Sequence, residues 1–119
     1  MKLYESSEDY LETILILSKK GKVRSIDIVD DLHFSKPSVS VAMKKLRENG
    51  YIIIDDKGYI SLTDEGYKVA SKTYERHLIL TEIFVSMGVD EETASKDACR
   101  IEHDLSDVTF EAIKKAYNK

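Results

Sequence analysis

Two short amphipathic helices joined by a tight turn and followed at once by a β-hairpin form the feature that most restricts how this sequence can fold. We expect Ser25 to cap the first of these helices and Ser35 to cap the second, since serine hydroxyls accept hydrogen bonds from the free N–H groups of a helix start. The turn between them falls at 33–34, where Phe34 is expected to anchor the core. The second helix ends at Asn49-Gly50, a pair typical of a left-handed stop. This arrangement predicts a helix-turn-helix.

A hairpin is predicted directly after the second helix. Residues 51–54 and 59–62 are rich in isoleucine and tyrosine, and Asp55-Asp-Lys-Gly58 between them has the composition of a tight turn. A helix-turn-helix followed by a hairpin is a winged helix, in which the hairpin lies along the DNA backbone. The sequence therefore predicts a DNA-binding domain.

The distribution of charge agrees with this prediction. The formal net charge of −4 argues against a protein that coats nucleic acid without regard to sequence. Residues 33–47 nevertheless contain basic side chains and no acidic one, and phosphate contacts depend on local charge. The residues predicted to face DNA lie on the second helix and the hairpin, and they are Ser35, Lys36, Pro37, Ser38, Ser40, Lys44, Lys45 and Lys57. For Lys44 and Lys45 the alternative is a solvated helix face.

Three further helices are predicted in the C-terminal half. Thr63 caps a long helix over 63–87, and Asp90 and Ser106 cap two shorter ones. The long helix exceeds what a small domain requires, so it suits a connector between two units. The two short helices are too small to bury both of their faces alone, so we expect the chain to form a homodimer.

The predicted first helix carries a pair of carboxylates. We expect Ser6 or Ser7 to cap this helix and the helix to end near Ser18. Asp9 and Glu12 lie at positions i and i+3, beside its apolar face. Acidic residues in a first turn also complement the helix dipole, and for this pair alone that is the simpler interpretation.

The C-terminal half supplies more side chains that can bind a metal. Cys99, Glu102 and His103 occupy positions i, i+3 and i+4, which share one face of a helix, and His77 lies midway along the long helix. Each also has a structural interpretation. His77 could pair with a glutamate of its own helix, Glu102 and His103 could be a solvated pair, and Cys99 could be a small buried apolar residue.

Taken together, these groups predict a site for one divalent cation. Mixed oxygen, nitrogen and sulfur donors suit Mn²⁺, Fe²⁺, Co²⁺ or Zn²⁺ better than Mg²⁺ or Ca²⁺. The thiolate favours the softer metals, whereas the carboxylates favour Mn²⁺ or Fe²⁺. The predicted ligands are Asp9, Glu12, His77, Cys99, Glu102 and His103.

Several motifs extend the prediction to a family. They are Ser7-Glu-Asp-Tyr-Leu-Glu-Thr-Ile14, Lys36-Pro-Ser-Val-Ser40, Leu62-Thr63 with Gly66, Glu75-Arg-His77, Gly88-Val-Asp90 and Cys99-Arg-Ile-Glu-His-Asp-Leu-Ser106. With these motifs nearly the whole chain resembles the metal-dependent repressors of the diphtheria-toxin-repressor and manganese-transport-regulator type. The resemblance implies that the six residues above are the metal ligands. It also implies that a metal-loaded homodimer binds a palindromic double-stranded operator and controls metal-uptake genes.

The resemblance combines features of two branches of that family. Asp9 is similar to the manganese branch, where the iron branch has Met, and Cys99 is similar to the iron branch, where the manganese branch has Glu. Thr81 and Ser95 stand where the Glu and His of the iron branch's ancillary site would be. We therefore expect one ion per chain, Mn²⁺ or Fe²⁺, with Co²⁺, Ni²⁺ or Zn²⁺ able to bind in vitro. The third, SH3-like domain of the iron branch is expected to be absent.

These elements define the expected fold class and location. We predict a mainly α protein with a small β-hairpin wing, with a winged helix-turn-helix DNA-binding domain at 1–62 and a helical metal-binding and dimerisation domain at 63–119. No apolar run approaches the roughly 20 residues that a membrane span needs. The N-terminus lacks an apolar signal segment, and a single Cys excludes an internal disulfide. We therefore predict a cytoplasmic protein without a membrane partner.

Two other functions are compatible with the same residues. A constitutive winged-helix regulator, whose Glu102–His103 pair is structural, would bind its operator in the presence of a chelator. A metalloenzyme using the Cys/Glu/His cluster is the weakest alternative, since the sequence offers no nucleophile motif, glycine-rich loop or element for a small organic substrate.

Overall fold

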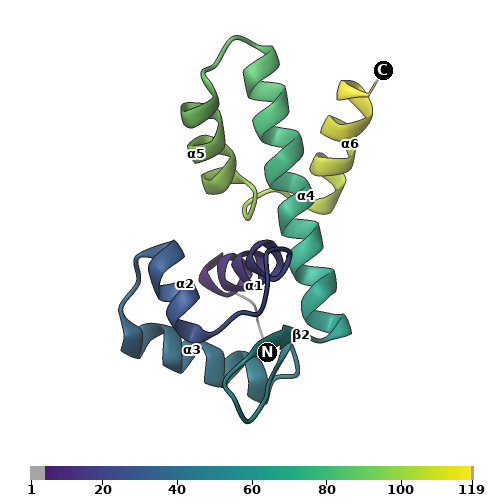
Figure 1. The fold of residues 1–119 in the computed structure, drawn as a ribbon. Coiled ribbons are helices and arrows are strands. Elements are labelled where there is room, and N and C mark those ends of the chain that lie inside the picture. The colour runs from purple at the N-terminus through teal and green to yellow at the C-terminus, as the bar shows by residue number, and fades with distance from the viewer. Residues whose placement is uncertain (1–4, 119) are drawn as a thin grey trace. The chain divides into compact units, whose positions relative to one another are not determined.

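The described part of the chain, residues 5–118, contains six helices and one two-stranded hairpin (Figure 1). In this computed structural model the chain divides into two compact units, residues 1–71 and 72–119. The predicted domain boundary between residues 62 and 63 stays a prediction. No helix among the described residues is long and apolar enough to cross a membrane.

Unit 1 is built on a core of three helices. Helix α1 (Glu5–Ser18) contacts α2 (Ser25–Leu32), and α2 contacts α3 (Lys36–Glu48). The hairpin of β1 (Ile52–Ile54) and β2 (Ile60–Leu62) closes this core, because β1 contacts α3 and β2 contacts α1. The buried side chains are almost entirely aliphatic and come from every element, with Leu11, Ile14, Val23, Ile28, Val39, Met43, Leu46, Ile52 and Ile60 at its centre.

The helix starts follow the predicted capping only in part. Ser35 caps α3 as predicted, because its hydroxyl accepts a hydrogen bond from the Ser38 N–H at 3.3 Å. The prediction for α2 was wrong by one residue, since Arg24 is the N-cap and its N–H donates to the Asp27 carboxylate at 2.8 Å. The caps predicted for α1, Ser6 or Ser7, are also wrong, because both lie inside the helix.

The turn between α2 and α3 falls where the sequence predicted it. His33 adopts a left-handed conformation (φ 59°) and its N–H donates to the Val29 carbonyl at 2.9 Å, which ends α2. Phe34 is less buried than expected, with 39% of its surface exposed. Its ring nevertheless contacts the Tyr10 ring edge-on, with 5.7 Å between the ring centres.

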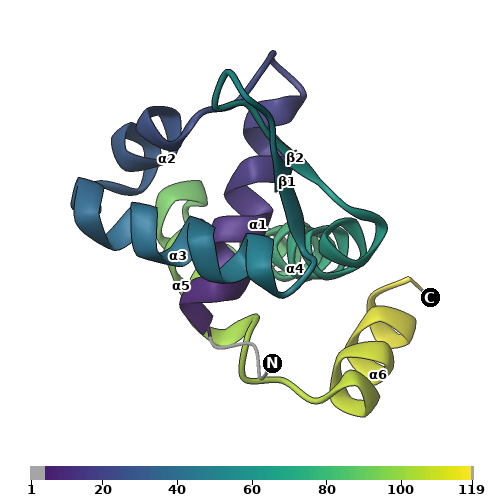
Figure 2. The same ribbon diagram turned by 90° about the horizontal axis from the view of Figure 1, so that it is seen from below.

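The wing is a short antiparallel hairpin ordered by one aspartate (Figure 2). Ile53 pairs with Ser61 at its centre. In the turn, the Asp55 carboxylate accepts hydrogen bonds from the N–H groups of Lys57 at 2.9 Å and Tyr59 at 2.8 Å. The Ile60 N–H, next to the turn of the wing, donates at 2.7 Å to the carbonyl of Val23, which lies in the segment between α1 and α2. An aspartate turn and an extra bridge therefore hold a hairpin that would be marginal alone.

The start of α4 (Asp64–Ser86) is locked to the chain that leaves α3. The Thr63 hydroxyl caps α4 by accepting from the Gly66 N–H at 3.1 Å, as predicted, and it donates to the Gly50 carbonyl at 2.6 Å. Gly66 itself lies against the backbone of Tyr51. A Cβ added at Gly66 would lie 2.0 Å from the Tyr51 carbonyl oxygen.

Unit 2 consists of the rest of α4 with α5 (Glu91–Ile101) and α6 (Asp107–Tyr117) against different sides of it (Figure 1). The predicted caps of the two short helices are confirmed, since Asp90 accepts from the Thr93 N–H at 3.0 Å and Ser106 from the Thr109 N–H at 3.1 Å. The hydrogen bond from the Thr93 N–H contributes most to lowering the pKa of the Asp90 carboxyl. Small alanines on α5 and Phe110 on α6 are buried.

A Gly66→Ala substitution should destabilise the protein by about 2–3 kcal/mol, because the added methyl group meets backbone that cannot rotate away. Urea unfolding followed by circular dichroism measures this change. Lys68→Ala, in the same turn of α4, removes only an exposed pair with Glu65 and should change stability by less than about 0.5 kcal/mol. Equal stability of the two variants would contradict the close approach at Gly66.

Candidate metal centre and DNA-reading surface

Two of the predicted metal ligands of unit 2 lie around the buried carboxylate of a third. Glu102 follows the last turn of α5, and its side chain is 0% exposed. One carboxylate oxygen, Oε2, lies 3.0 Å from Nδ1 of His77 on α4. The other, Oε1, lies 3.4 Å from Nε2 of His103, whose side chain is only 3% exposed. The structure thus brings together three of the six predicted ligands, and the interpretation of Glu102 and His103 as a solvated pair is wrong.

This arrangement fits a divalent cation. Burial of a carboxylate is costly unless opposite charge or hydrogen bonds offset it. Within the described residues, Oε1 of Glu102 accepts no hydrogen bond that meets ordinary geometric limits. Two imidazoles and a carboxylate are the donors that divalent transition metals use in proteins.

His77 is held from both of its ring nitrogens. Nδ1 faces Glu102, and Nε2 lies 3.3 Å from the Ser95 hydroxyl on α5. The Thr81 hydroxyl donates to the His77 carbonyl at 2.7 Å. Thr81 and Ser95 are the residues that stand in place of the Glu and His of the iron branch's ancillary site. Both of them contact His77. The carboxylate that faces His77 therefore belongs to Glu102, directly after α5.

Cys99 does not join this group. Its side chain is exposed, and no cluster of metal-ligand atoms found among the described residues includes it. Helix α5 ends at Ile101, and the chain tightens into a turn in which the Asp104 N–H donates to the Ile101 carbonyl at 3.0 Å. The prediction of one continuous helical face through Cys99, Glu102 and His103 is therefore wrong. The alternative of a buried apolar Cys99 is wrong as well.

The remaining two candidates lie on α1 in unit 1. Glu12 is buried, with 8% of its surface exposed, and Asp9 is half-buried. Complementing a helix dipole does not require a buried glutamate, because an exposed carboxylate can do so without the cost of desolvation. Since these two residues belong to unit 1 and the other four to unit 2, their convergence on one cation stays a prediction.

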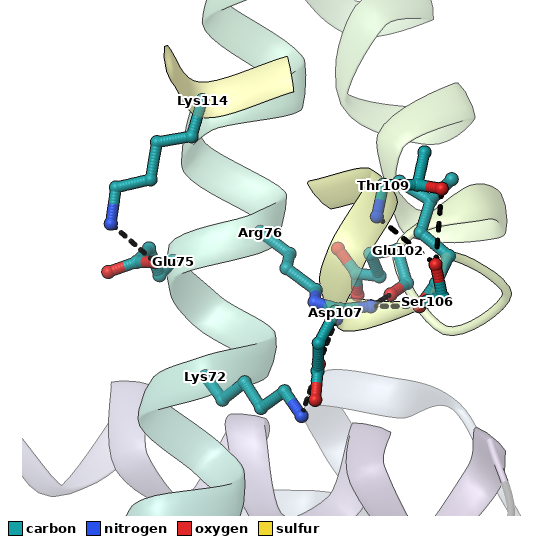
Figure 3. A network of polar contacts seen from close by, with 9 residues as sticks. Lys72, Glu75, Arg76, Glu102, Ser106, Asp107, Thr109 and Lys114 are labelled. Atoms are coloured by element: carbon teal, nitrogen blue, oxygen red, sulfur yellow. Dashed lines mark hydrogen bonds and ion pairs between the residues drawn. The ribbon is translucent and has the colours of Figure 1, made fainter. Parts of the chain in front are cut away.

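An arginine that sequence reasoning left out of the site holds the chain beside Glu102 (Figure 3). The Arg76 guanidinium donates to the carbonyls of Glu102 at 3.0 Å and Leu105 at 2.6 Å, and to the Asp107 carboxylate at 2.6 Å. Its side chain is 7% exposed, and it lies over the Phe110 ring at 5.0 Å. Arg76 therefore fixes the segment between α5 and α6. In the sequence, the one sign that Arg76 belongs to the site is its position directly before His77 in the Glu75-Arg-His77 motif.

Asp107 is the charged partner at the end of this network. Lys72, at 2.7 Å, contributes most to lowering the pKa of the Asp107 carboxyl, and Arg76 adds to the effect. A second pair, between Lys114 and Glu75 at 3.1 Å, joins α6 to α4 (Figure 3). These contacts connect α4 and α6 by polar side chains.

The predicted DNA-facing residues are exposed on unit 1. Val39, Met43 and Leu46 turn one face of α3 into the core, so the opposite face is available to DNA. The Ser35 hydroxyl donates to the Ser38 hydroxyl at 2.8 Å, so both serines are engaged at the start of α3. The predicted residues that are exposed on α3, on its cap and at the tip of the wing are Ser35, Lys36, Pro37, Ser38, Ser40, Lys44, Lys45 and Lys57.

Two basic residues beside the wing were missed. The Lys22 ammonium lies 4.8 Å from the centre of the Tyr59 ring, and the Arg24 guanidinium lies 4.4 Å from it. Cation–π contacts of this kind hold both charges beside the turn of the wing. The signal in the sequence was the group of basic residues between the first and second helices.

Comparisons with known proteins agree over the whole chain. The profile of the iron dependent repressor, N-terminal DNA binding domain, matches residues 2–60. The profile of the iron dependent repressor, metal binding and dimerisation domain, matches residues 63–119.

Individual proteins give the same result. An uncharacterised HTH-type transcriptional regulator of Methanocaldococcus jannaschii is 34% identical over 92% of this chain and 90% of its own length. The HTH-type transcriptional regulator MntR of Bacillus subtilis is 35% identical over 85% of this chain and 72% of its own length. The solved manganese regulator SloR superposes with a TM-score of 0.81 at 30% identity, over 99% of this chain and 55% of that one. A manganese-dependent transcriptional repressor in complex with manganese has a TM-score of 0.83 at 26% identity, over 92% of this chain and 51% of that one. The chain thus spans about half the length of these two solved proteins.

Replacing Arg76 by Met should destabilise the protein by about 2–4 kcal/mol, because it leaves buried carbonyls without donors. Urea unfolding measures the change. Arg100→Met is the matched control, since Arg100 is exposed and makes only a 3.6 Å pair with Asp97. If both variants unfold at the same urea concentration as the parent chain, Arg76 does not hold the segment between α5 and α6.

Proposed function

Since the chain belongs to the iron-dependent repressor family, we propose that it represses metal-uptake genes when Mn²⁺ or Fe²⁺ is bound. Its relatives are transcriptional regulators and not enzymes, and the chain is a metal-dependent transcriptional regulator of this family. The family binds divalent metals and operator DNA, and it dimerises. The identity of the metal, the genes and the form of the operator are the parts that we propose.

The observation that supports the metal response is the buried Glu102 carboxylate between two imidazoles. A constitutive regulator would need no such group, since an apolar side chain of the same size would stabilise unit 2 at least as well. We infer that Glu102, His77 and His103 are metal ligands, joined by Asp9, Glu12 and Cys99. A bound divalent cation would accept lone pairs from the oxygen, nitrogen and sulfur atoms of these side chains.

Mn²⁺ is the effector that we favour, with Fe²⁺ as the alternative. Similar proteins are named as manganese regulators, and oxygen and imidazole donors suit Mn²⁺. The exposed thiol of Cys99 is the feature that favours Fe²⁺ or a softer metal. Because histidines ligate metals in the neutral form, protons compete with the metal for the imidazoles, so metal affinity should fall at acid pH.

DNA recognition follows from the geometry of unit 1. Helix α3 enters the major groove, and the Lys57 tip of the wing contacts phosphate. In a homodimer on a palindromic operator, two copies of α3 lie about 34 Å apart, one turn of DNA. If the metal-loaded form binds operator more tightly, operator must raise the metal affinity by the same factor.

Anaerobic calorimetric titration of the chelator-treated protein with Mn²⁺ and with Fe²⁺ tests the metal site. We expect saturable binding near one ion per chain, since only one set of ligands is predicted. His103→Ala should weaken binding at least about tenfold, because it removes a ligand from a preformed group.

Cys99→Ala separates the thiol from the other ligands. In Co²⁺-loaded protein a bound thiolate gives a charge-transfer absorption, which should disappear in this variant while Mn²⁺ affinity changes little. Absence of binding of either ion to the parent chain would instead support the constitutive winged-helix regulator.

Replacing Lys36 and Lys44 together by Ala should weaken operator binding and lower the salt slope of log Kd by roughly two per chain, one for each phosphate contact. Fluorescence anisotropy over a series of salt concentrations measures both quantities. Lys96→Ala removes another exposed lysine, on α5, and should leave the slope unchanged. An unchanged slope in the double variant would refute the assignment of these two lysines to phosphate.

A further inference from the structure

One apolar side chain lies in the middle of the DNA-facing surface of α3. Val41 is 55% exposed, whereas Val39, Met43 and Leu46 are at most 2% exposed and face the core. With roughly 100° of rotation per residue, Val41 lies on the side of the helix opposite these three residues. It is therefore the part of α3 that projects farthest from the core of unit 1.

The neighbours of Val41 on this face are a proline and two lysines. Pro37 lies one turn before it, and the exposed Lys44 and Lys45 lie one turn after it. A branched aliphatic group gains nothing from this position in the free protein, because its surface faces water and β-branching slightly lowers helix propensity. Its position suggests contact with something apolar that the lysines bring close.

The major groove contains one apolar group, the C5-methyl of thymine, and aliphatic side chains contact it there. The other short side chains at the start of α3 are less free to read bases, since the hydroxyls of Ser35 and Ser38 bond to each other. The Val41 side chain has no hydrogen-bonding group, so it can distinguish thymine only from bases that lack the C5-methyl group.

We propose that Val41 determines operator specificity by contacting the C5-methyl of one thymine in each half-site. This inference rests on the proposed DNA-binding function and adds the base that the helix selects. The isopropyl group and the methyl group are both desolvated by the contact, while Lys44 and Lys45 supply the attraction to phosphate on either side. Specificity at this base pair then comes from apolar burial and not from a hydrogen bond.

Replacing thymine by deoxyuridine tests the contact, because it removes only the methyl group. The probe is a duplex that the Mn²⁺-loaded wild-type chain selects from a random-sequence pool, with each thymine changed in turn. One position per half-site should raise Kd about fourfold, and both half-sites changed together about fifteenfold. Val41→Ala should bind the thymine duplex more weakly by a similar factor and should bind the thymine and deoxyuridine duplexes equally well.

Two controls make the outcome specific. Alanine is a better helix former than valine, so the variant should fold, and its thermal unfolding checks this. Val108→Ala removes a more exposed valine, 81% exposed on α6 in unit 2, and should keep the full response to deoxyuridine. A wild-type chain indifferent to deoxyuridine at every position, or a Val41→Ala chain that keeps the wild-type response, overturns the inference and leaves the proposed function standing. Failure of the metal-loaded chain to select any duplex overturns both.

Discussion

The buried carboxylate of Glu102 is the group on which unit 2 depends. An unpaired charge cannot remain in a protein interior without a large cost, so its surroundings must supply partners. Two imidazoles face its two oxygens, and Arg76 holds the carbonyl of the same residue. The side chain and the backbone of one residue are thus both held by α4, through His77 and Arg76. Removing any partner would leave a polar group buried without compensation, which explains why so small a unit contains so ordered a polar network.

Unit 1 differs from unit 2 because its core is mainly apolar. The packing of this core determines which residues face solvent on its predicted DNA-binding surface. The side chains that α3 buries leave only one face of that helix for DNA. At the wing the Asp55 turn and the bridge between Val23 and Ile60 replace the apolar burial that a two-stranded hairpin lacks. A rigid head with a polar outer face can read DNA, whereas a polar and titratable centre in the other unit can respond to an ion. The two functions of a metal-dependent regulator therefore use two kinds of interior.

Much of the fold could be predicted because its signals are local. The caps at Ser35, Thr63, Asp90 and Ser106 each act over three residues, and the isoleucine-rich strands with an aspartate turn identify the wing. Errors arose where two local signals competed. At the start of α2, Ser25 has the residue type of a cap, but the Asp27 carboxylate accepts the Arg24 N–H and makes Arg24 the capping residue.

By itself the sequence determined the elements, their order, the exposed face of α3 and the residue types able to bind a metal, since helical periodicity and capping depend on neighbours within one or two turns. Only the tertiary structure decided which of those residues meet. His77 and Glu102, 25 positions apart, share a hydrogen bond, whereas Cys99, three positions from Glu102, faces solvent. Arg76 likewise contacts the site through tertiary structure, since it donates to the carbonyls of Glu102 and Leu105, more than 25 positions away. Spacing along a helix predicts a face, but the packing of other helices decides which part of that face is buried and where the helix ends.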